Sequence, residues 1–227
     1  MLACDQCPVR NRAACASLSE EDRQEMARSG RTITLARGET LFAAGGSNDR
    51  CATLISGALK VSKLDSSGDE HMLALIHPAG FVGELFTPFA THDVIALTES
   101  RLCVFSRIQI TKTMAAHPEL GQALLQRAQA DLHSARNLLA LSNRRSAQAQ
   151  VAGLVLALGH AASESPCHAA PQFDLPLTRG EMAELLGLTI ETVSRQLSAL
   201  ETKGFLRRSG ARGIELAEPQ RLAELAA

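Results

Sequence analysis

The sequence predicts an α+β fold made of an antiparallel β-roll, a long helix and a C-terminal pair of short helices with a hairpin. Short alternating segments, separated by Gly, Ser and Asp, fill residues 31–107. A helical pattern of apolar residues then runs from about 117 to 144. Two helix signatures and a basic hairpin follow between residues 177 and 216.

The composition fits a globular protein without a membrane segment. The chain has 227 residues, of which 45% are hydrophobic, so it can bury the core of one large or two modest domains. No apolar run resembles a signal peptide or approaches the ~20 residues that span a bilayer. We therefore expect a soluble, cytoplasmic protein without a membrane partner. The net charge of −1 does not exclude nucleic-acid binding, since a basic face on one domain is sufficient.

Three of the six cysteines lie in a short N-terminal leader, residues 1–17. Cys4, Cys7 and Cys15 follow one another there, among too few large apolar residues for the leader to fold alone. In a cytoplasmic protein such cysteines argue for free thiols, metal ligands or redox sensing rather than for a disulfide scaffold.

Residues 18–115 are predicted to form the β-roll domain. A short helix at 18–30 begins it, because Ser19 is a suitable N-cap and acidic residues fill the first turn. Many short strands at this spacing favour a sandwich, roll or barrel of antiparallel strands. Gly57 and Gly80 are expected to be turn residues only. The predicted strands are 32–35, 40–42, 52–55, 58–61, 72–76 and 101–105.

After Phe105 the pattern becomes helical, and residues 116–145 are predicted to contain one long helix. Apolar residues recur there at steps of three and four, which is typical of a helix–helix seam. The seam either packs on its own domain or pairs two chains, and the position of the helix between two domains favours a homodimer. Asp131 lies beside the seam and is expected to resist the approach of a second helix. The predicted interface residues are Leu125, Ala128, Leu132, Ala135 and Leu139.

The last predicted domain, residues 146–227, carries a helix–turn–helix at 177–197. A helix at 147–162 and a loop at 163–171 precede this motif, and a hairpin with a basic tip follows it as a wing. A helix–turn–helix presents its second helix to the major groove, so we expect a protein that reads DNA.

Local signals place both short helices. Thr178 and Glu181 form a capping box, Gly187 is suited to end the first helix, and Thr189 is suited to cap the second. The apolar face of the second helix is Val193, Leu197 and Leu200. The opposite face carries Glu191, Ser194 and Arg195.

This order of parts resembles the CRP/FNR superfamily of bacterial transcription regulators over nearly the whole chain. The likeness rests on residues 37–42, 55–61 and 80–85, and above all on residues 177–205. It implies a jelly roll of the cyclic-nucleotide-binding type, a dimerisation helix and a winged helix–turn–helix. The partners it implies are double-stranded DNA, a second copy of the chain and RNA polymerase, without enzymatic activity.

Two further comparisons indicate the FNR branch of this superfamily. Members that bind cyclic AMP carry an Arg-Ser pair shortly after Gly-Glu-Leu, whereas residues 86–94 offer no arginine. A phosphate without a cationic partner is poorly held, so we expect no cyclic AMP. Glu191, Ser194 and Arg195 match the Glu-x-x-Ser-Arg pattern of the FNR branch, which implies a palindrome of TTGAT half-sites. Contacts to the DNA backbone are expected from Thr178, Arg179, Thr189, Thr192, Arg208 and Arg212.

The cysteine spacing resembles that of FNR-like, oxygen-responsive regulators of α-proteobacteria. Four thiolates hold a [4Fe-4S] cluster or a structural zinc, so the three leader cysteines need a fourth ligand. Cys51, Cys103 and Cys167 are the candidates, and the resemblance implies Cys103. The predicted ligands of an oxygen-labile [4Fe-4S] cluster are therefore Cys4, Cys7, Cys15 and Cys103.

Other functions stay open from the sequence alone. The same cysteines suit a zinc site or a thiol–disulfide switch. Alternatively the thiols are unused, in a regulator that senses nitric oxide through a haem held by His71, His77 or His92. A redox or metal-handling enzyme with a winged-helix interaction module is least expected, because we find no nucleophile–base pair and no phosphate-binding glycine loop.

Overall fold

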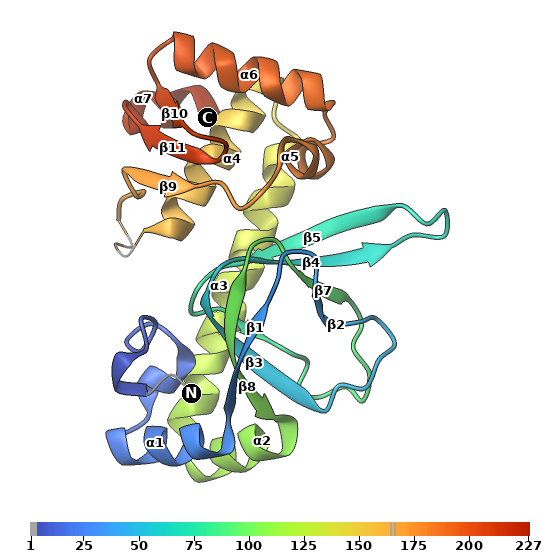
Figure 1. Ribbon diagram of the computed structural model, residues 1–227, viewed down its shortest axis with the longest axis vertical. Helices are drawn as coiled ribbons and strands as arrows, with labels where there is room; N and C mark the ends of the chain where they lie inside the picture. Colours follow the sequence, from blue (N-terminus) through green and yellow to red (C-terminus); the bar gives the residue numbers. More distant parts are fainter. Residues whose placement is uncertain (1–3, 164, 166) are drawn as a thin grey trace. The chain divides into compact units, whose positions relative to one another are not determined.

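The computed structural model describes residues 4–163, 165 and 167–227. The chain divides into two compact units, the first ending at Ala135 and the second beginning at Arg136. The division falls inside one long helix, α3 (Pro118–Ser142). Figure 1 traces the chain from the leader through the β-roll and α3 to the C-terminal helices and hairpin.

The leader is folded against the rest of the first unit. It contains two short 3-10 helices, η1 (Cys4–Gln6) and η2 (Ala14–Ser17). Val9 and Ala13 are buried and pack against Ala79 of the β-roll. The leader therefore takes its structure from its neighbour, as expected for a segment with few apolar residues.

Helix α1 (Glu20–Ser29) follows with the predicted start. Ser19 caps it by accepting the backbone N–H of Asp22 at 3.2 Å. Gly30 ends it in a crowded place, because a Cβ on Gly30 would lie 2.5 Å from the ring of Phe105.

Two four-stranded antiparallel sheets form the β-roll. Their strand orders are β1-β8-β3-β6 and β2-β7-β4-β5, and apolar side chains from both sheets meet in one core. The strands are β1 (Arg31–Leu35), β2 (Thr40–Phe42), β3 (Arg50–Ser56), β4 (Leu59–Leu64), β5 (Glu70–Ile76), β6 (Phe81–Val82), β7 (Asp93–Ala96) and β8 (Ser100–Ser106).

Strand β8 separates two apolar cores. It pairs with β1 and β3, and Cys103 lies opposite Thr53 of β3. Side chains alternate along a strand, so Leu102 and Val104 enter the core of the roll. Cys103 and Phe105 face the other side, where Phe105 joins a second core with residues of the leader, α1, α2 (Arg107–Ala116) and α3.

The second unit packs helices around a small sheet of order β10-β11-β9. Val151, Leu154 and Val155 of its first complete helix, α4, are fully buried, which explains the uniformly apolar sequence there. The elements are α4 (Ala147–Ala162), β9 (Gln172–Asp174), α5 (Arg179–Leu186), α6 (Ile190–Thr202), β10 (Leu206–Ser209), β11 (Gly213–Leu216) and α7 (Pro219–Ala226).

The predicted α+β fold class is confirmed, and the differences from the sequence prediction lie in short elements. The helix predicted at 147–162 has those bounds as α4. Strands β6, β7 and β9 were not predicted, because two to four residues are too few to show an alternation. Helix α7 was not predicted either. Gly80 has no positive φ and instead packs closely on Ile76. No described helix is long and apolar enough to cross a lipid bilayer.

Substitution Gly57→Ala is expected to destabilise the first unit. Gly57 has a φ of +94°, and a Cβ there would lie 2.4 Å from Ser100 Oγ and 2.5 Å from the carbonyl oxygen of Glu99. The left-handed backbone alone costs a residue with a Cβ about 1–2 kcal/mol, and the close contacts add to that cost. Urea unfolding measures the loss.

Gly38→Ala is the matched control for this variant. Gly38 also has a positive φ, +85°, but no atom would lie within 4 Å of its added Cβ. It should therefore lose only the conformational part of the free energy of unfolding. Equal losses in the two variants would contradict a role for the close contacts of Gly57.

Candidate functional site

Local residues fix both ends of the turn between α5 and α6. Thr178 and Glu181 form the predicted capping box. Gly187 ends α5 in the left-handed conformation, with φ of 64°. Thr189 caps α6 by accepting the backbone N–H of Thr192 at 3.2 Å. The helix–turn–helix is therefore formed where the sequence predicts it.

The buried face of α6 determines which side chains meet solvent. Val193, Leu197 and Leu200 are fully buried against the second unit. Glu191 and Arg195, one turn apart, are exposed on the other side, and Ser194 between them is half-buried. The structure thus brings the three predicted base-reading residues together on one face.

Hydrogen bonds hold the two charged groups of this face. The Nη2 atom of Arg195 donates to Thr192 Oγ1 at 3.4 Å. Hydrogen bonds from its own backbone N–H and from the Thr189 hydroxyl lower the pKa of Glu191. Glu191 is therefore ionised at neutral pH and presents an acceptor, while Arg195 presents a donor beside it.

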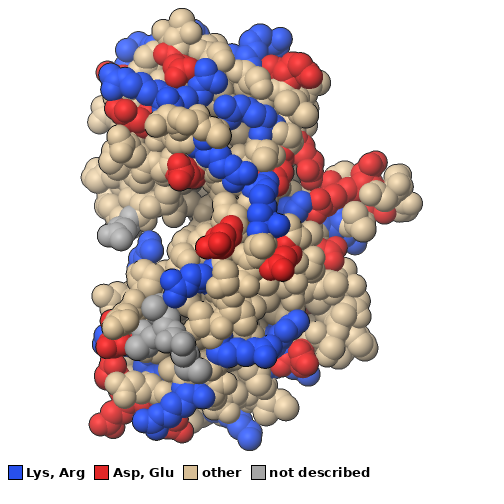
Figure 2. Space-filling view, viewed as in Figure 1, with Lys and Arg blue, Asp and Glu red and all other residues tan. Residues whose placement is uncertain are grey.

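The wing carries basic residues that already have acidic partners. Nε of Arg208 donates to Glu201 Oε2 at 2.7 Å, and Nη1 of Arg207 donates to Glu215 Oε1 at 2.8 Å. Figure 2 shows that Lys and Arg atoms on the visible face of the second unit are interspersed with acidic atoms in the same way. The positive charge of the wing is thus partly balanced within the chain.

The other residues predicted to contact the DNA backbone lie around the same motif. The hydroxyls of Thr178 and Thr189 accept backbone N–H groups as caps, and Thr192 bonds to Thr189. Burial, and then the nearby charge of Arg208, lower the pKa of Arg179. Arg212 is half-buried near the tip of the hairpin.

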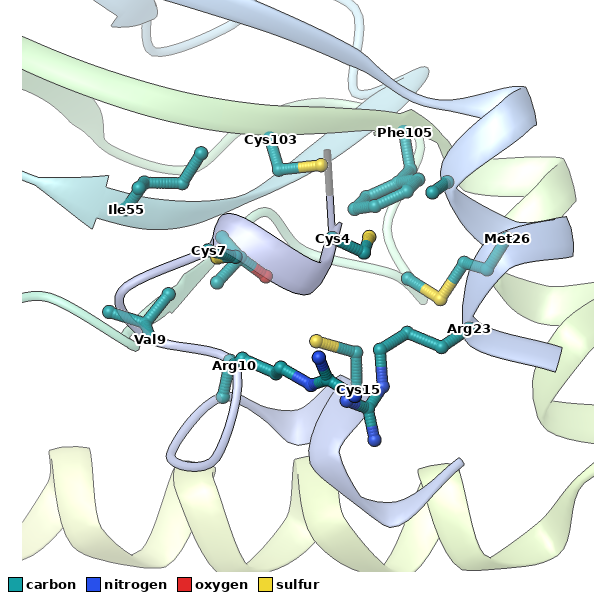
Figure 3. A pocket seen from close by; sticks show the side chains of 13 residues that line it. Cys4, Cys7, Val9, Arg10, Cys15, Arg23, Met26, Ile55, Cys103 and Phe105 are labelled. Atoms are coloured by element: carbon teal, nitrogen blue, oxygen red, sulfur yellow. The ribbon is translucent and has the colours of Figure 1, made fainter. Parts of the chain in front are cut away.

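The four cysteines predicted as ligands line one pocket of the first unit. Cys4 lies on η1, Cys7 follows it, Cys15 lies on η2 and Cys103 lies on β8. In Figure 3 the four side chains surround one space between the leader and the sheet. The cavity has about 40 Å³, against the roughly 10–15 Å³ that one water requires.

The pocket does not have the geometry of a single-ion site. Among the described residues, no group of three or more His, Cys, Asp or Glu side chains is close enough to hold one metal ion. Cys51 is fully buried, and its Sγ lies 3.8 Å from the carbonyl oxygen of Phe105. Cys167 is exposed in the second unit.

Burial favours the protonated form of three of the pocket thiols, those of Cys4, Cys15 and Cys103. Burial, and then the charges of the neighbouring cysteines, raise the pKa of Cys103 to about 12. Burial and then Cys7 raise the pKa of both Cys4 and Cys15. In both cases the positive charge of Arg23 is the largest effect in the opposite direction.

Sequence reasoning did not identify the two arginines that line this pocket. Arg10 lies in the leader and Arg23 on α1, and both side chains reach the cysteines. Figure 3 places both guanidinium groups beside Cys15. The sequence offers only a weak indication of their role. Arg23 follows Glu20 by three residues, so the two lie on one side of a helix, but no local pattern relates either residue to the cysteines.

The predicted seam of α3 is largely exposed in the single chain. The exposed fractions of Leu125, Leu132 and Leu139 are 62%, 51% and 67%. Ala128 is exposed and Ala135 is half-buried. Asp131 is half-buried, and its Oδ1 lies 3.4 Å from Nε of Arg127, so its charge is partly balanced within the helix. The three leucines of the seam are therefore left largely open to solvent by the described residues.

The histidines considered as haem ligands have other environments. His71 pairs with Asp65 at 2.9 Å, and burial with the charge of Arg127 lowers the pKa of His77 to about 4. His92 lines a cavity of about 140 Å³ inside the β-roll, beside Glu84. No arginine or lysine among the described residues lines that cavity.

Comparison with known proteins finds a matching family for each of the two domains of the chain. Residues 32–117 match the family described as the cyclic nucleotide-binding domain, and residues 149–225 match the Crp-like helix-turn-helix domain. The transcriptional activator protein FnrL of Cereibacter sphaeroides is 34% identical, over 97% of this chain and 90% of FnrL. The nitrogen fixation regulation protein FixK of Bradyrhizobium diazoefficiens is 29% identical, over 99% of this chain and 94% of FixK.

Solved structures share the fold. FixK2 from Bradyrhizobium japonicum is 27% identical, with a TM-score of 0.76 over 87% of this chain and 98% of FixK2. The CRP-family regulator TTHB099 from Thermus thermophilus has a TM-score of 0.68 at 18% identity, over 86% of this chain and 96% of that protein. At that identity the second likeness concerns the fold alone.

In the metal-free protein, iodoacetamide is expected to label the exposed Cys167 first and the buried Cys51 and Cys103 last. Alkylation requires the thiolate, and burial both covers Cys103 and raises its pKa to about 12. Below that pKa the thiolate fraction rises about tenfold per pH unit, so labelling of Cys103 should accelerate steeply as the pH rises. Mass spectrometry of the labelled peptides measures both rates. Equal rates for Cys103 and Cys167 in the folded protein at neutral pH, and not only in denaturant, would contradict the burial of Cys103.

Proposed function

The chain belongs to the CRP/FNR family of DNA-binding transcription regulators, and from this premise we propose that it binds DNA when oxygen is low. Regulators of this family act as dimers. In the proposal, Cys4, Cys7, Cys15 and Cys103 hold a [4Fe-4S] cluster, and two chains pair along α3. The paired α6 helices then bind a palindrome of TTGAT half-sites.

The observation that carries the proposal is the pocket that gathers sulfurs from two distant segments. Three thiols come from the leader and one from β8. Four cysteine thiolates are the ligand set of a [4Fe-4S] cluster. The four thiols line one pocket between the leader and β8, an arrangement that suits a group taking one ligand from each of them. The donor set therefore fits the cluster.

The leader connects this pocket to α3. When bound, a [4Fe-4S] cluster supplies a cross-link between the leader and β8 that oxygen can break. Behind Cys15, the residues Ala13, Ala14 and Ala16 line a groove together with Ala123 and Ala130 of α3. Small side chains bring the two segments close, so a change in the position of the leader alters the packing of α3.

Pairing along α3 accounts for the exposed seam. Leucines at this exposure cost free energy in water, and a second α3 would bury them. Arg127 balances part of the charge of Asp131, which reduces the repulsion expected there. A weak dimer of this kind suits a regulator, because a small difference in free energy between the two states then shifts the equilibrium.

The chemistry of α6 suits the proposed half-site. Arg195 can donate two hydrogen bonds to O6 and N7 of guanine, and the Glu191 carboxylate can accept from the N4 amino group of cytosine. Ser194 is placed to contact a neighbouring base. Two such helices about 34 Å apart engage successive major grooves, so the palindrome should be bound far more tightly than one half-site.

Anaerobically purified protein is expected to contain about four irons and four sulfides per chain and to lose its broad visible absorption in air. Cys103→Ala should lose both, because β8 then offers no ligand. Cys51→Ala is the matched control, since Cys51 lies on the neighbouring strand and faces the second core. Iron and sulfide analysis with absorption spectra measures both variants. A colourless wild-type protein that contains zinc would show the proposed cofactor to be wrong.

Arg195→Ala is expected to weaken binding to the TTGAT palindrome by about 1–3 kcal/mol. Exchange of the half-site G·C pair should weaken wild-type binding but leave the variant nearly unaffected, because the contact to that base is already lost. Arg212→Ala should weaken binding to all sequences alike and reduce the salt slope by about one. Fluorescence anisotropy in anaerobic buffers at several salt concentrations measures these affinities. If the wild-type protein with intact cofactor binds palindrome and random DNA equally, the proposed target is refuted.

A further inference from the structure

Arg23 turns its side chain from α1 into the cysteine pocket and leaves one donor without an acceptor. Only 11% of the side chain is exposed. Nη2 donates to the carbonyl oxygen of Leu18 at 3.1 Å, and Nη1 lies 3.8 Å from Glu20 Oε2. The third nitrogen, Nε, is buried and has no hydrogen-bond partner among the described residues. Buried donors without partners are rare because they forfeit their hydrogen bonds to water.

Most side-chain acceptors that line this pocket are sulfurs, and Thr53 of β3 adds one hydroxyl. Arg23 lines it together with Cys4, Cys7, Cys15 and Cys103, and in Figure 3 its guanidinium lies beside Cys15. Its positive charge acts on both Cys4 and Cys15. A thiolate or sulfide is a better acceptor than a thiol, so Nε would gain a strong partner when the pocket holds ionised sulfur.

Arg10, the other arginine of the pocket, differs in this respect. Its Nη2 donates to Glu20 Oε2 at 2.5 Å, so a carboxylate already offsets its charge. Glu20 thereby holds Arg10 closely and Arg23 only loosely. Of the two pocket arginines, Arg23 is therefore the one whose Nε–H has no acceptor and whose positive charge is less offset by Glu20.

We propose that Arg23 donates its Nε–H to a sulfur of the bound cluster and that it thereby protects the cluster against oxygen. This inference rests on the proposed function, because it requires the [4Fe-4S] cluster. A four-thiolate cluster carries a net negative charge, which a buried cation and an N–H donor both stabilise. The same interactions oppose removal of an electron, since removal makes the cluster less negative. Arg23 acts on the cluster through a hydrogen bond and is not a ligand.

The test compares Arg23→Gln with Arg28→Gln in the full-length protein, reconstituted anaerobically. Arg28 lies on the same helix and is exposed, so its variant makes the same change of charge outside the pocket. Groups that hydrogen-bond to metal ligands typically alter metal affinity or activity about 10–100-fold. We therefore expect R23Q to lose its visible absorption in air about tenfold faster than the wild type, and R28Q to match the wild type.

Two further readouts separate this role from a structural one. Resonance Raman spectra should show a shift of the Fe–S(Cys) stretching bands in R23Q but not in R28Q, because only the first removes an N–H···S bond. R23K restores the positive charge without the Nε–H group. Its cluster should therefore decay at a rate between those of R23Q and the wild type.

The outcomes distinguish this inference from the function on which it rests. A wild-type protein without iron and sulfide overturns both. A wild-type cluster with an R23Q cluster of equal oxygen stability and unshifted Fe–S bands overturns only the role of Arg23. If R23Q assembles no cluster, thermal unfolding of the metal-free protein decides between the two roles. An unchanged melting temperature supports a role of Arg23 at the cluster. A lowered melting temperature, together with an R23K variant that also assembles no cluster, overturns it in favour of a structural role.

Discussion

The pairing of β8 between β1 and β3 is the constraint on which the rest of the first unit depends. Leu102 and Val104 enter the core of the β-roll, and Cys103 and Phe105 on the same strand face the leader. A slip of one residue would exchange the two faces and drive Cys103 into the core. The free energy that fixes the core therefore also fixes the one cysteine that the sheet contributes to the pocket.

The leader contributes the other sulfurs and depends on the same strand. It has few large side chains and is held by Val9, Ala13 and the loop around Ala79. Such a segment buries little apolar area, so its attachment is weak enough to be changed by a few bonds at its cysteines. Its alanines also lie along α3. The leader thus contributes both to the pocket and to the groove along the first part of α3.

The sequence predicted those features whose physical cause is local. Caps and a left-handed glycine marked the helix–turn–helix, and uniform apolarity marked α4. The convergence of the cysteines came from a family likeness, since no spacing relates Cys15 to a residue on β8. Features that depend on the assembled fold could not be predicted. The burial of Arg23 Nε and the contact between Gly57 and Ser100 both arise from neighbours that only the tertiary structure brings together.

The pairing of Arg208 with Glu201 has a consequence for how this protein moves on DNA. In the proposed complex a phosphate contacts Arg208, so it would have to displace the Glu201 carboxylate from the guanidinium. On arbitrary sequence no base contact would offset that exchange, and contacts of the wing would be brief. Where α6 also binds its bases, the added hydrogen bonds would outweigh the lost ion pair. An internal competitor of this kind would shorten the residence time on the wrong sites and so speed the search for the right one.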